Sequence, residues 1–325
     1  MTVRVGVVGT GFGARVVAPV FAATDGCDVV SVVSARDDSG VAALCDDHDI
    51  DLVCVHSPPF LHATHVRHAL DRGHAVLCDK PFGVDAAQAE TLLAAAEVAD
   101  CLHLLNFEFR YDPTRVLVRD LVAGGAVGTP EHVQWTHLSA GSRHPLRPHG
   151  WLFERAKGGG WVGAWGSHAV DFLRWTFGDV EAVDARCRIT LAERPDADGV
   201  PRPCDAEDAF SAMLRLSGGV TATIDSSFAA PVSLAPRLVV IGSDGVLECV
   251  ADAKVVVRHP DGGRDERGAP AGGDPHLAPM RRYAAVVRDS VAEGMAFPGA
   301  PTFADGLECA RVLDRLRAGG QGERR

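Results

Sequence analysis

Arg4-Val-Gly-Val-Val8 runs directly into Gly9-Thr-Gly11-Phe12-Gly13-Ala14, and this stretch predicts the fold of the first half of the chain. A short apolar strand ends at closely spaced glycines, and an apolar helix-forming segment follows from residue 15. Glycine lets the backbone turn tightly and approach the oxygens of a diphosphate, and the N-terminus of the following helix presents unpaired N–H groups to that anion. The stretch matches G-x-G-x-x-G/A with Ala14 in the last position and predicts a dinucleotide site; a glycine-rich loop that binds nothing is the alternative.

The composition is that of a globular protein with length for two domains. The chain has 325 residues, of which 46% are hydrophobic, and a formal net charge of −11. This charge argues against nucleic acid and against an anionic membrane, so a small molecule is the expected partner. No apolar run is long enough to cross a bilayer and no secretion signal is recognised, so we expect a cytoplasmic protein. Nine scattered cysteines without a C-x-x-C predict free thiols, with neither disulfides nor zinc.

Apolar strands alternate with helices over residues 1–112. Strands are expected at 27–33, 51–56, 75–78 and 101–106, and helices at 40–47, 61–71 and 86–99. This alternation indicates a Rossmann-type parallel sheet covered on both faces. Only one short helix fits between residues 34 and 51. We therefore expect the edge strand and one helix of the usual dinucleotide fold to be missing.

The pattern changes at residue 113. A helix is expected at 113–123, and alternating stretches such as 132–137 and 209–216 predict half-buried strands. The prediction is an α+β domain on a largely antiparallel sheet at residues 113–325, following a dinucleotide-binding domain at 1–112. Residues 258–275, rich in Gly, Asp and Pro, are expected to form a solvated loop.

Two further stretches carry side chains suited to chemistry. Asp79-Lys80-Pro81 follows a predicted strand, at the edge where doubly wound sheets bind ligands; a solvated turn is the alternative. Gly158-Gly-Gly160 precedes an apolar helix that carries His168 and Asp171 one turn apart on one face. A single helical histidine is more often structural, but the glycines and two neighbouring tryptophans favour a site here.

Taken in order, these stretches resemble the Gfo/Idh/MocA family (glucose-fructose oxidoreductase, inositol dehydrogenase, rhizopine catabolism) of nicotinamide-dependent dehydrogenases. The resemblance covers nearly the whole chain and also rests on Val55-His-Ser-Pro-Pro-Phe-Leu-His62, Asn106-Phe-Glu-Phe-Arg-Tyr-Asp-Pro113 and Phe303-Ala-Asp-Gly306. It implies an NAD(P)-dependent oxidoreductase that transfers hydride to or from a hydroxyl or carbonyl carbon of a sugar, cyclitol or cyclic diol. It also implies a homodimer or homotetramer formed through the sheet of the second domain.

The resemblance assigns roles to individual residues. Lys80 and His168 would be the catalytic pair, because an imidazole with an ordinary pKa of about 6.5 can accept a hydroxyl proton and an ammonium can stabilise a developing oxyanion. Residues expected to bind the cofactor are Gly9, Gly11, Phe12, Gly13, Ser34, Arg36, Ser57, Pro58, His62, Asp79, Lys80 and Asn106. Candidate substrate contacts are Arg110, Trp151, Trp165 and Asp171.

One departure from the family pattern concerns catalysis. Many members have an aspartate four residues before the histidine, and here that position is Ala164. A carboxylate there would orient or stabilise the imidazole, so its absence predicts an active site retuned toward reduction or a less polar substrate. The alternative is a nucleotide-binding sensor or regulatory protein that keeps the fold without the chemistry.

Three further features bear on ligands. Ser34-Ala-Arg36 follows the second strand in place of a lone acidic residue, which favours NADP over NAD, although two aspartates follow. Histidines at 62, 65 and 68 recur in steps of three, which drift around a helix by about 60° each, so no metal site is expected. The polar loop at 143–151 is either a substrate lid or a solvated loop.

Overall fold

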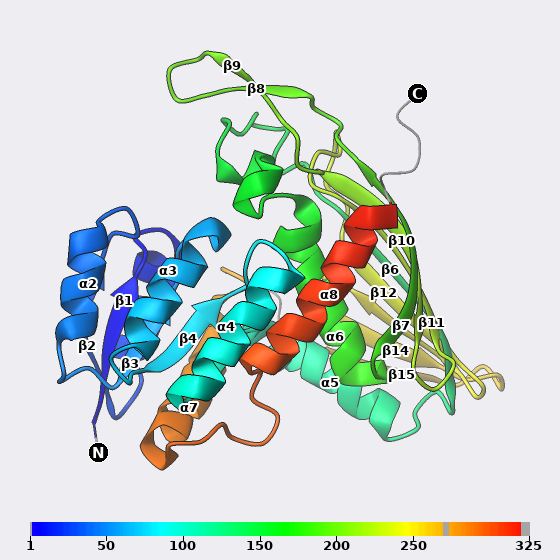
Figure 1. Ribbon diagram of the computed structural model, residues 1–325. Helices are drawn as coiled ribbons and strands as arrows, with labels where there is room; N and C mark the ends of the chain where they lie inside the picture. Colours follow the sequence, from blue (N-terminus) through cyan, green and yellow to red (C-terminus); the bar gives the residue numbers. More distant parts are fainter. Residues whose placement is uncertain (1, 269–272, 320–325) are drawn as a thin grey trace. The chain divides into compact units, whose positions relative to one another are not determined.

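The computed structural model describes residues 2–268 and 273–319, and the chain forms two compact units. Unit 1 combines Met1–Tyr111, Ala156–Gly158 and Asp274–Arg311, and unit 2 combines Asp112–Arg155, Gly159–Gly273 and Val312–Arg325. Each unit is built on its own sheet (Figure 1).

Unit 1 contains the predicted parallel sheet, which the structure confirms. Its strands are β1 (Val3–Val8), β2 (Cys27–Val33), β3 (Leu52–Val55), β4 (Ala75–Asp79) and β5 (His103–Asn106). They pair in the order β2-β1-β3-β4-β5, all parallel. Among the described residues no strand pairs with the outer side of β2, so the sheet ends there, as the short segment after it predicts. β2 is only half-buried because it lies at this edge.

Helices cover both faces of this sheet (Figure 1). They are η1, a π-helical turn (Gly13–Val17), α1 (Ala18–Ala22), α2 (Asp38–Asp46), α3 (Pro59–Leu70), α4 (Ala86–Ala99), η2, a 3-10 turn (Glu108–Tyr111), and α7 (Leu277–Glu293). Val5 and Val7 pack in the cluster that contains residues of η1, α1 and α7. Gly6 faces the other side, where an added Cβ would lie 2.8 Å from Leu44 of α2. Successive residues of β1 therefore face opposite sides of the sheet, as strand geometry requires.

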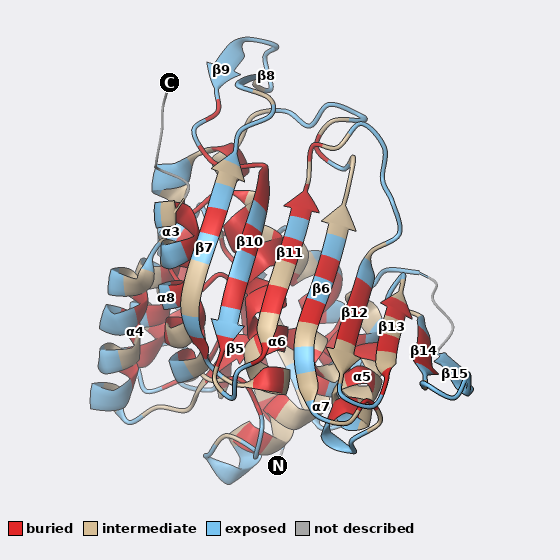
Figure 2. Ribbon diagram, turned by 90° about the vertical axis from the view of Figure 1, so that its right-hand side faces the viewer, coloured by how far each residue is buried: buried red, intermediate tan, exposed pale blue. Residues whose placement is uncertain are grey.

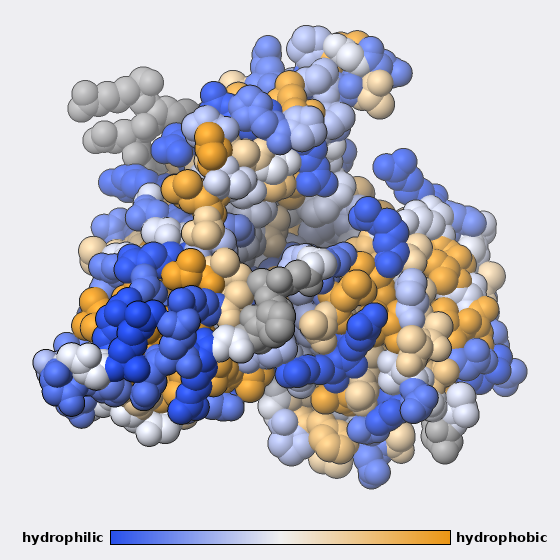
Figure 3. Space-filling model, turned by 180° about the vertical axis from the view of Figure 1, so that it is seen from behind, coloured by the Kyte–Doolittle hydropathy of each residue, from blue (hydrophilic) through white to orange (hydrophobic). Residues whose placement is uncertain are grey.

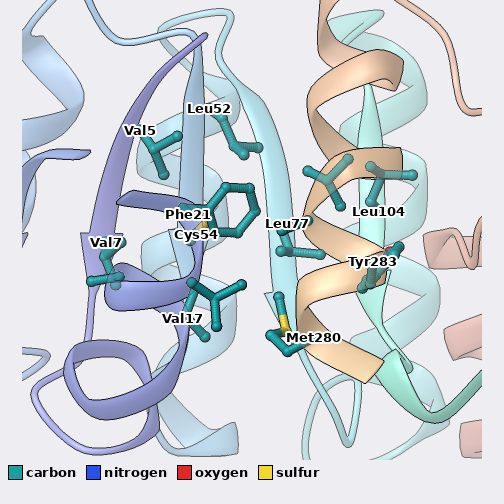
Figure 4. Close-up of a cluster of buried hydrophobic side chains, with 14 of the residues drawn as sticks. Val5, Val7, Val17, Phe21, Leu52, Cys54, Leu77, Leu104, Met280 and Tyr283 are labelled. Atoms are coloured by element: carbon teal, nitrogen blue, oxygen red, sulfur yellow. The ribbon is translucent and has the colours of Figure 1, made fainter. Parts of the chain in front are cut away.

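Helix α7 belongs to unit 1, although it follows the strands of unit 2 in the sequence. Figure 4 shows Met280 and Tyr283 of α7 beside Leu77 and Leu104, in the cluster that also holds Phe21. The Tyr283 hydroxyl donates a hydrogen bond to the Leu105 carbonyl oxygen at 2.8 Å. The segment predicted as one domain at 113–325 is therefore divided between the two units, and Asp274–Arg311 belongs to unit 1. The reason is that the apolar stripe of α7 is buried against the face of the parallel sheet.

Unit 2 contains the largely antiparallel sheet, as predicted. Its strands are β6 (Pro130–Leu138), β7 (Val180–Arg188), β10 (Ala209–Leu216), β11 (Thr221–Ser227), β12 (Arg237–Gly242), β13 (Val246–Val250), β14 (Lys254–Arg258) and β15 (Arg264–Gly268). The order is β15-β14-β13-β12-β6-β11-β10-β7, and only the β6–β11 pair is parallel. The loop predicted at 258–275 is wrong in part, because β15 pairs with β14 there. All five residues of β15 are exposed, so this charged edge strand carries no apolar signal.

One face of this sheet is buried and the other is open. Along β10, Ala212 and Leu214 are buried while Ser211 and Met213 are exposed, an alternation that Figure 2 shows on several strands. On the buried face, Trp135 of β6 meets Phe172 with ring centroids 5.4 Å apart. The remaining elements of the chain are η3 (Trp151–Phe153), η4 (Arg155–Lys157), α5 (Pro113–Ala123), η5, a second π-helical turn (Val162–Gly166), α6 (Ser167–Phe177), α8 (Phe303–Gly319), β8 (Glu193–Pro195) and β9 (Pro201–Pro203).

The exposed apolar side chains are dispersed. On the face drawn in Figure 3, hydrophilic and hydrophobic residues are intermingled. Exposed apolar residues such as Val98, Met213 and Met295 come from different elements. Within the described part of the chain, no helix combines the length and the apolar character needed to span a membrane.

Candidate active site

The glycine-rich loop after β1 has the backbone geometry that a diphosphate requires. Gly9 has φ of 129°, and an added Cβ would collide with the carbonyl oxygen of His56. A Cβ at Gly11 would meet no heavy atom within 4 Å, so the chain surface there is open to a ligand. A Cβ at Gly13 would lie 3.0 Å from Val7, so this glycine lets η1 pack closely on β1. The three glycines thus serve the turn, the ligand approach and the packing.

Polar side chains gather at the carboxyl ends of β3, β4 and β5, next to this loop. Asp79 accepts hydrogen bonds from the Asn106 side-chain amide at 3.3 Å and from the Lys80 backbone N–H at 2.9 Å. Its other oxygen lies 3.4 Å from Nδ1 of His56. Burial alone would raise the pKa of Asp79, but the His56 imidazole and the Lys80 ammonium hold it well below its ordinary value. Asp79 is therefore a carboxylate at neutral pH.

Two buried polar atoms of this cluster have no partner among the described residues. They are Nε2 of His56, whose side chain is 0% exposed, and the side-chain oxygen of Asn106, which is also 0% exposed. A buried polar atom without a hydrogen bond is costly, which makes such atoms candidates for ligand contact. Ribose hydroxyls and a carboxamide offer both donors and acceptors, so these residues fit a nicotinamide nucleotide.

Ser57 and Pro58 connect β3 to α3, and two histidines of α3 contact Ser57. Nε2 of His62 donates to the Ser57 carbonyl oxygen at 2.8 Å, and Nδ1 of His65 lies 3.0 Å from the Ser57 hydroxyl oxygen. Burial lowers the pKa of His62 to about 4, so its ring is neutral at pH 7. The fully buried His62 therefore positions Ser57, and its predicted contact with the cofactor stays a prediction.

At the other end of the predicted cofactor site, Ser34 and Arg36 follow β2. The Arg36 backbone N–H donates to the Ser34 hydroxyl oxygen at 3.2 Å, and the Arg36 residue is exposed. Asp37 accepts hydrogen bonds from the Ser39 hydroxyl at 2.7 Å and the Gly40 N–H at 3.0 Å, as the N-cap of α2. These hydrogen bonds lower the pKa of Asp37. The first acidic side chain after β2 is thus engaged by its own helix.

In unit 2, the glycine segment leads into η5 and α6. His168 and Asp171 occupy the first turns of α6 and are 4% and 3% exposed. Gly160 has φ of 104°, and an added Cβ would collide with the Glu207 carboxylate. Glu207 forms a buried ion pair with Arg317 at 3.2 Å. Arg317 also donates to the Gly159 carbonyl oxygen at 3.0 Å, so this pair holds the segment that precedes the histidine helix.

Aromatic side chains line the same segment. Trp165 is 8% exposed, and its ring meets those of Trp135 and His137 with centroids 5.4 and 4.7 Å apart. Trp161 stacks on Phe228 with centroids 4.3 Å apart. Trp165 lies in η5 and packs against the β6 side chains of Trp135 and His137. Its predicted substrate contact stays a prediction.

Ala164 lies beside a hydrophobic cluster that also contacts a cation, because the Arg194 guanidinium carbon stands 4.0 Å from the centroid of the Phe153 ring. Ala164 and Trp151 pack against a small cluster formed by Leu152, Phe153 and Cys204. The position that the family pattern fills with a carboxylate is therefore adjacent to hydrophobic side chains. Trp151, another candidate substrate contact, belongs to this cluster.

Arg110, also a candidate substrate contact, has a structural partner within unit 1. Its guanidinium is 7% exposed and donates to the Asp305 carboxylate at 2.8 Å. Asp305 in turn accepts from the Thr302 N–H at 2.9 Å at the start of α8. This ion pair ties the segment after β5 to α8.

The sequence predictions missed two residues of these sites. His56 contacts Asp79 and was not selected, although it directly follows a predicted strand, which is a signal that the strand-end rule provides. Arg317 was missed because it lies far from Glu207 in the sequence, and nothing in the pattern of α8 marks it.

Comparisons with known proteins agree with this geometry. Residues 3–107 match the model of an oxidoreductase family with an NAD-binding Rossmann fold, and residues 116–248 match a GFO/IDH/MocA C-terminal domain. The chain is 27% identical to a levoglucosan dehydrogenase of Pseudarthrobacter phenanthrenivorans over 57% of its own length and 51% of that protein. It is 31% identical to inositol 2-dehydrogenase 3 of Saccharopolyspora erythraea over 57% and 56% of the two chains. The chain thus spans about half the length of these two relatives.

A solved structure extends the likeness of fold to nearly the whole chain. Levoglucosan dehydrogenase in complex with NADH and levoglucosan superimposes with a TM-score of 0.87 at 22% identity, covering 98% of this chain and 97% of that one. The two matched family models together cover more than half of the 325 residues. The chain belongs to the Gfo/Idh/MocA family of NAD(P)-binding oxidoreductases.

Proposed function

We propose that the protein transfers hydride between the nicotinamide of NAD(P) and a hydroxyl or carbonyl carbon of a sugar, cyclitol or cyclic diol. The observation that carries this proposal is the cluster of Asp79, Asn106 and His56, whose buried unpaired atoms lie beside the glycine-rich loop. The names of the relatives, levoglucosan and inositol dehydrogenases, support the substrate class. When bound, the nicotinamide would supply the hydride chemistry.

We assign the proton chemistry to Lys80 and His168. Lys80 would hydrogen-bond the reacting oxygen and stabilise its negative charge, and His168 would exchange the hydroxyl proton. Asp79 supports Lys80, because its carboxylate attracts the Lys80 ammonium electrostatically. Ala164 and its apolar neighbours favour a substrate that places C–H groups, not a further hydroxyl, next to this position.

We propose NADP as the preferred cofactor. Asp37 is engaged at the N-terminus of α2, which leaves the exposed Arg36 to meet the group at the 2′ position of the adenosine ribose. Titration with NADPH and NADH tests this preference. Arg36→Ala should weaken NADPH binding several-fold and leave NADH binding unchanged; equal effects on both would contradict it.

We also propose that the protein is a homodimer or homotetramer that assembles through the open face of the unit 2 sheet. Met213, 60% exposed in the middle of β10, lies on this face. Met213→Glu should lower the molar mass measured by light scattering, whereas Val98→Glu on α4 should not. A wild-type monomer would contradict the proposal.

The central experiment combines binding with turnover. Wild-type protein should bind NADPH or NADH and reduce or oxidise members of a panel of sugars and cyclitols. His168→Asn should lower turnover by about 10²- to 10⁴-fold with a cofactor Kd within threefold of wild type. Lys80→Ala should also reduce turnover strongly, and unchanged turnover would rule out its assignment. Tight cofactor binding without turnover on any substrate would favour a sensor or regulatory protein.

A further inference from the structure

A buried carboxylate and a half-exposed imidazole form an ion pair that the proposed chemistry does not use. Glu108, in η2 just after β5, has a side chain that is 1% exposed, and one of its oxygens lies 2.7 Å from Nδ1 of His276. The His276 side chain is 33% exposed and stands at the N-cap of α7. The two residues are 168 positions apart in the sequence and meet within unit 1.

The His276 ring is held between two aromatic rings. It stacks on Phe109 with centroids 5.1 Å apart and an interplanar angle of 21°. It meets the Phe12 ring edge-on, at 74° and 5.1 Å. Phe12 belongs to the glycine-rich loop, directly after Gly11, where the loop surface is open. The imidazole is therefore fixed in orientation, next to the part of the glycine-rich loop where the diphosphate of a dinucleotide would bind.

The Glu108 contact determines which nitrogen is available. A carboxylate accepts hydrogen bonds only, so Nδ1 carries the hydrogen toward Glu108 and Nε2 lies on the opposite side of the ring. Arg15 already places a cationic side chain at this loop, because its Nε donates to the Gly11 carbonyl oxygen at 3.2 Å. His276 would add a second donor beside Phe12, since an imidazole between the Glu108 carboxylate and a phosphate oxygen donates from both ring nitrogens.

We propose that His276 is a cofactor-binding residue whose Nε2–H donates a hydrogen bond to the diphosphate of the bound dinucleotide. This inference rests on the proposed dinucleotide site and extends it with a residue from the other end of the chain. Glu108 is a positioning residue that acts through His276. The pair thereby links α7 to the glycine-rich loop.

Two substitutions of His276 test this assignment, because each replaces a different ring nitrogen by an amide nitrogen. Glutamine retains a donor near Nε2, and asparagine retains one near Nδ1. His276→Gln places an amide nitrogen near the position of Nε2 and loses the Glu108 partner, whereas His276→Asn keeps a donor for Glu108 and removes the atom at Nε2. Both variants lose the aromatic stacking equally. Kd is measured for NADH or NADPH, whichever wild type binds more tightly, and for ADP-ribose or its 2′-phosphate, which keep the diphosphate and lack nicotinamide.

His276→Asn should raise Kd about tenfold for the dinucleotide and for the ADP-ribose ligand. His276→Gln should stay within threefold of wild type for both. His48→Asn, an exposed histidine of unit 1, serves as the matched control and should leave both Kd values unchanged. Thermal unfolding without ligand verifies that each variant folds.

The remaining outcomes contradict the proposal in distinct ways. A larger loss of affinity in His276→Gln than in His276→Asn would mean that the contact with Glu108 is purely structural. Equal losses of affinity in the two variants would mean that only the aromatic packing of the ring matters. A loss confined to the dinucleotide would exclude the diphosphate as the ligand group, and no loss in either variant would exclude His276 altogether. Wild-type protein that binds neither dinucleotide would overturn the proposed function itself.

Discussion

The two units of this protein position their functional residues by different means. In unit 1 the candidate residues follow the carboxyl ends of buried parallel strands, so the backbone of the loops sets their place. In unit 2 the candidate histidine lies on a helix that packs against one face of a sheet whose other face is open. A site built from strand ends tolerates little change in its backbone, whereas a site on a packed helix depends on the side chains around it.

The largest expected effect concerns the backbone of unit 1. Gly9→Ala should lower the free energy of unfolding by about 3 kcal/mol or more, because φ of 129° strains any other residue and the new Cβ would collide with the His56 carbonyl. Denaturant unfolding measures this change. Gly11→Ala is the control: its Cβ meets open space, so stability should change by less than about 1 kcal/mol while dinucleotide affinity falls. Similar stability losses in both variants would contradict the distinct roles of these glycines.

The second effect concerns the side-chain environment in unit 2. Ala164→Asp should lower the free energy of unfolding by about 2 kcal/mol, because the carboxylate would lie against hydrophobic side chains such as Phe153. Dinucleotide Kd should stay unchanged, since unit 1 carries the cofactor residues. Ala164→Asn introduces a side chain of similar size without a charge and should lower the free energy of unfolding by a smaller amount. A stabilised Ala164→Asp would instead show that the carboxylate finds a partner such as His168.

The smallest effect is a pH dependence from unit 1. Burial lowers the pKa of His62 to about 4 in the folded protein, below the value of about 6.5 expected when unfolded. The native state therefore binds fewer protons, so this contribution to stability is complete above pH 6.5 and is lost as the pH falls toward 4. The loss attributable to His62 between pH 6.5 and 5.5 is about 1 kcal/mol.

His62→Gln isolates this contribution. The glutamine amide can still donate to the Ser57 carbonyl oxygen but does not titrate, so the decline in stability below pH 6.5 should be shallower than in wild type. His48→Gln on the surface should keep the wild-type slope. An unchanged slope in His62→Gln would mean that the buried ring does not remain neutral.

Local patterns in the sequence were sufficient for most of the fold and for part of the site. The glycine spacing after β1, the apolar runs of β3 and β4 and the alternation along β10 each predict their element, because neighbouring residues determine backbone turns and burial periodicity. Asp79 and Asn106, predicted separately, come together because parallel strands end at the same edge. β15 was missed because an exposed, charged edge strand has no apolar periodicity.

The amino-acid order alone therefore determined the glycine-rich loop and the two types of sheet, and its resemblance to the Gfo/Idh/MocA family named Lys80 and His168 as candidate catalytic residues. The fold in three dimensions determined that α7 returns to the first sheet, that Glu108 meets His276, and that Ala164 packs beside a hydrophobic cluster. Turns and strand periodicity arise between near neighbours in the chain, whereas the environment of a side chain depends on segments that only packing brings together.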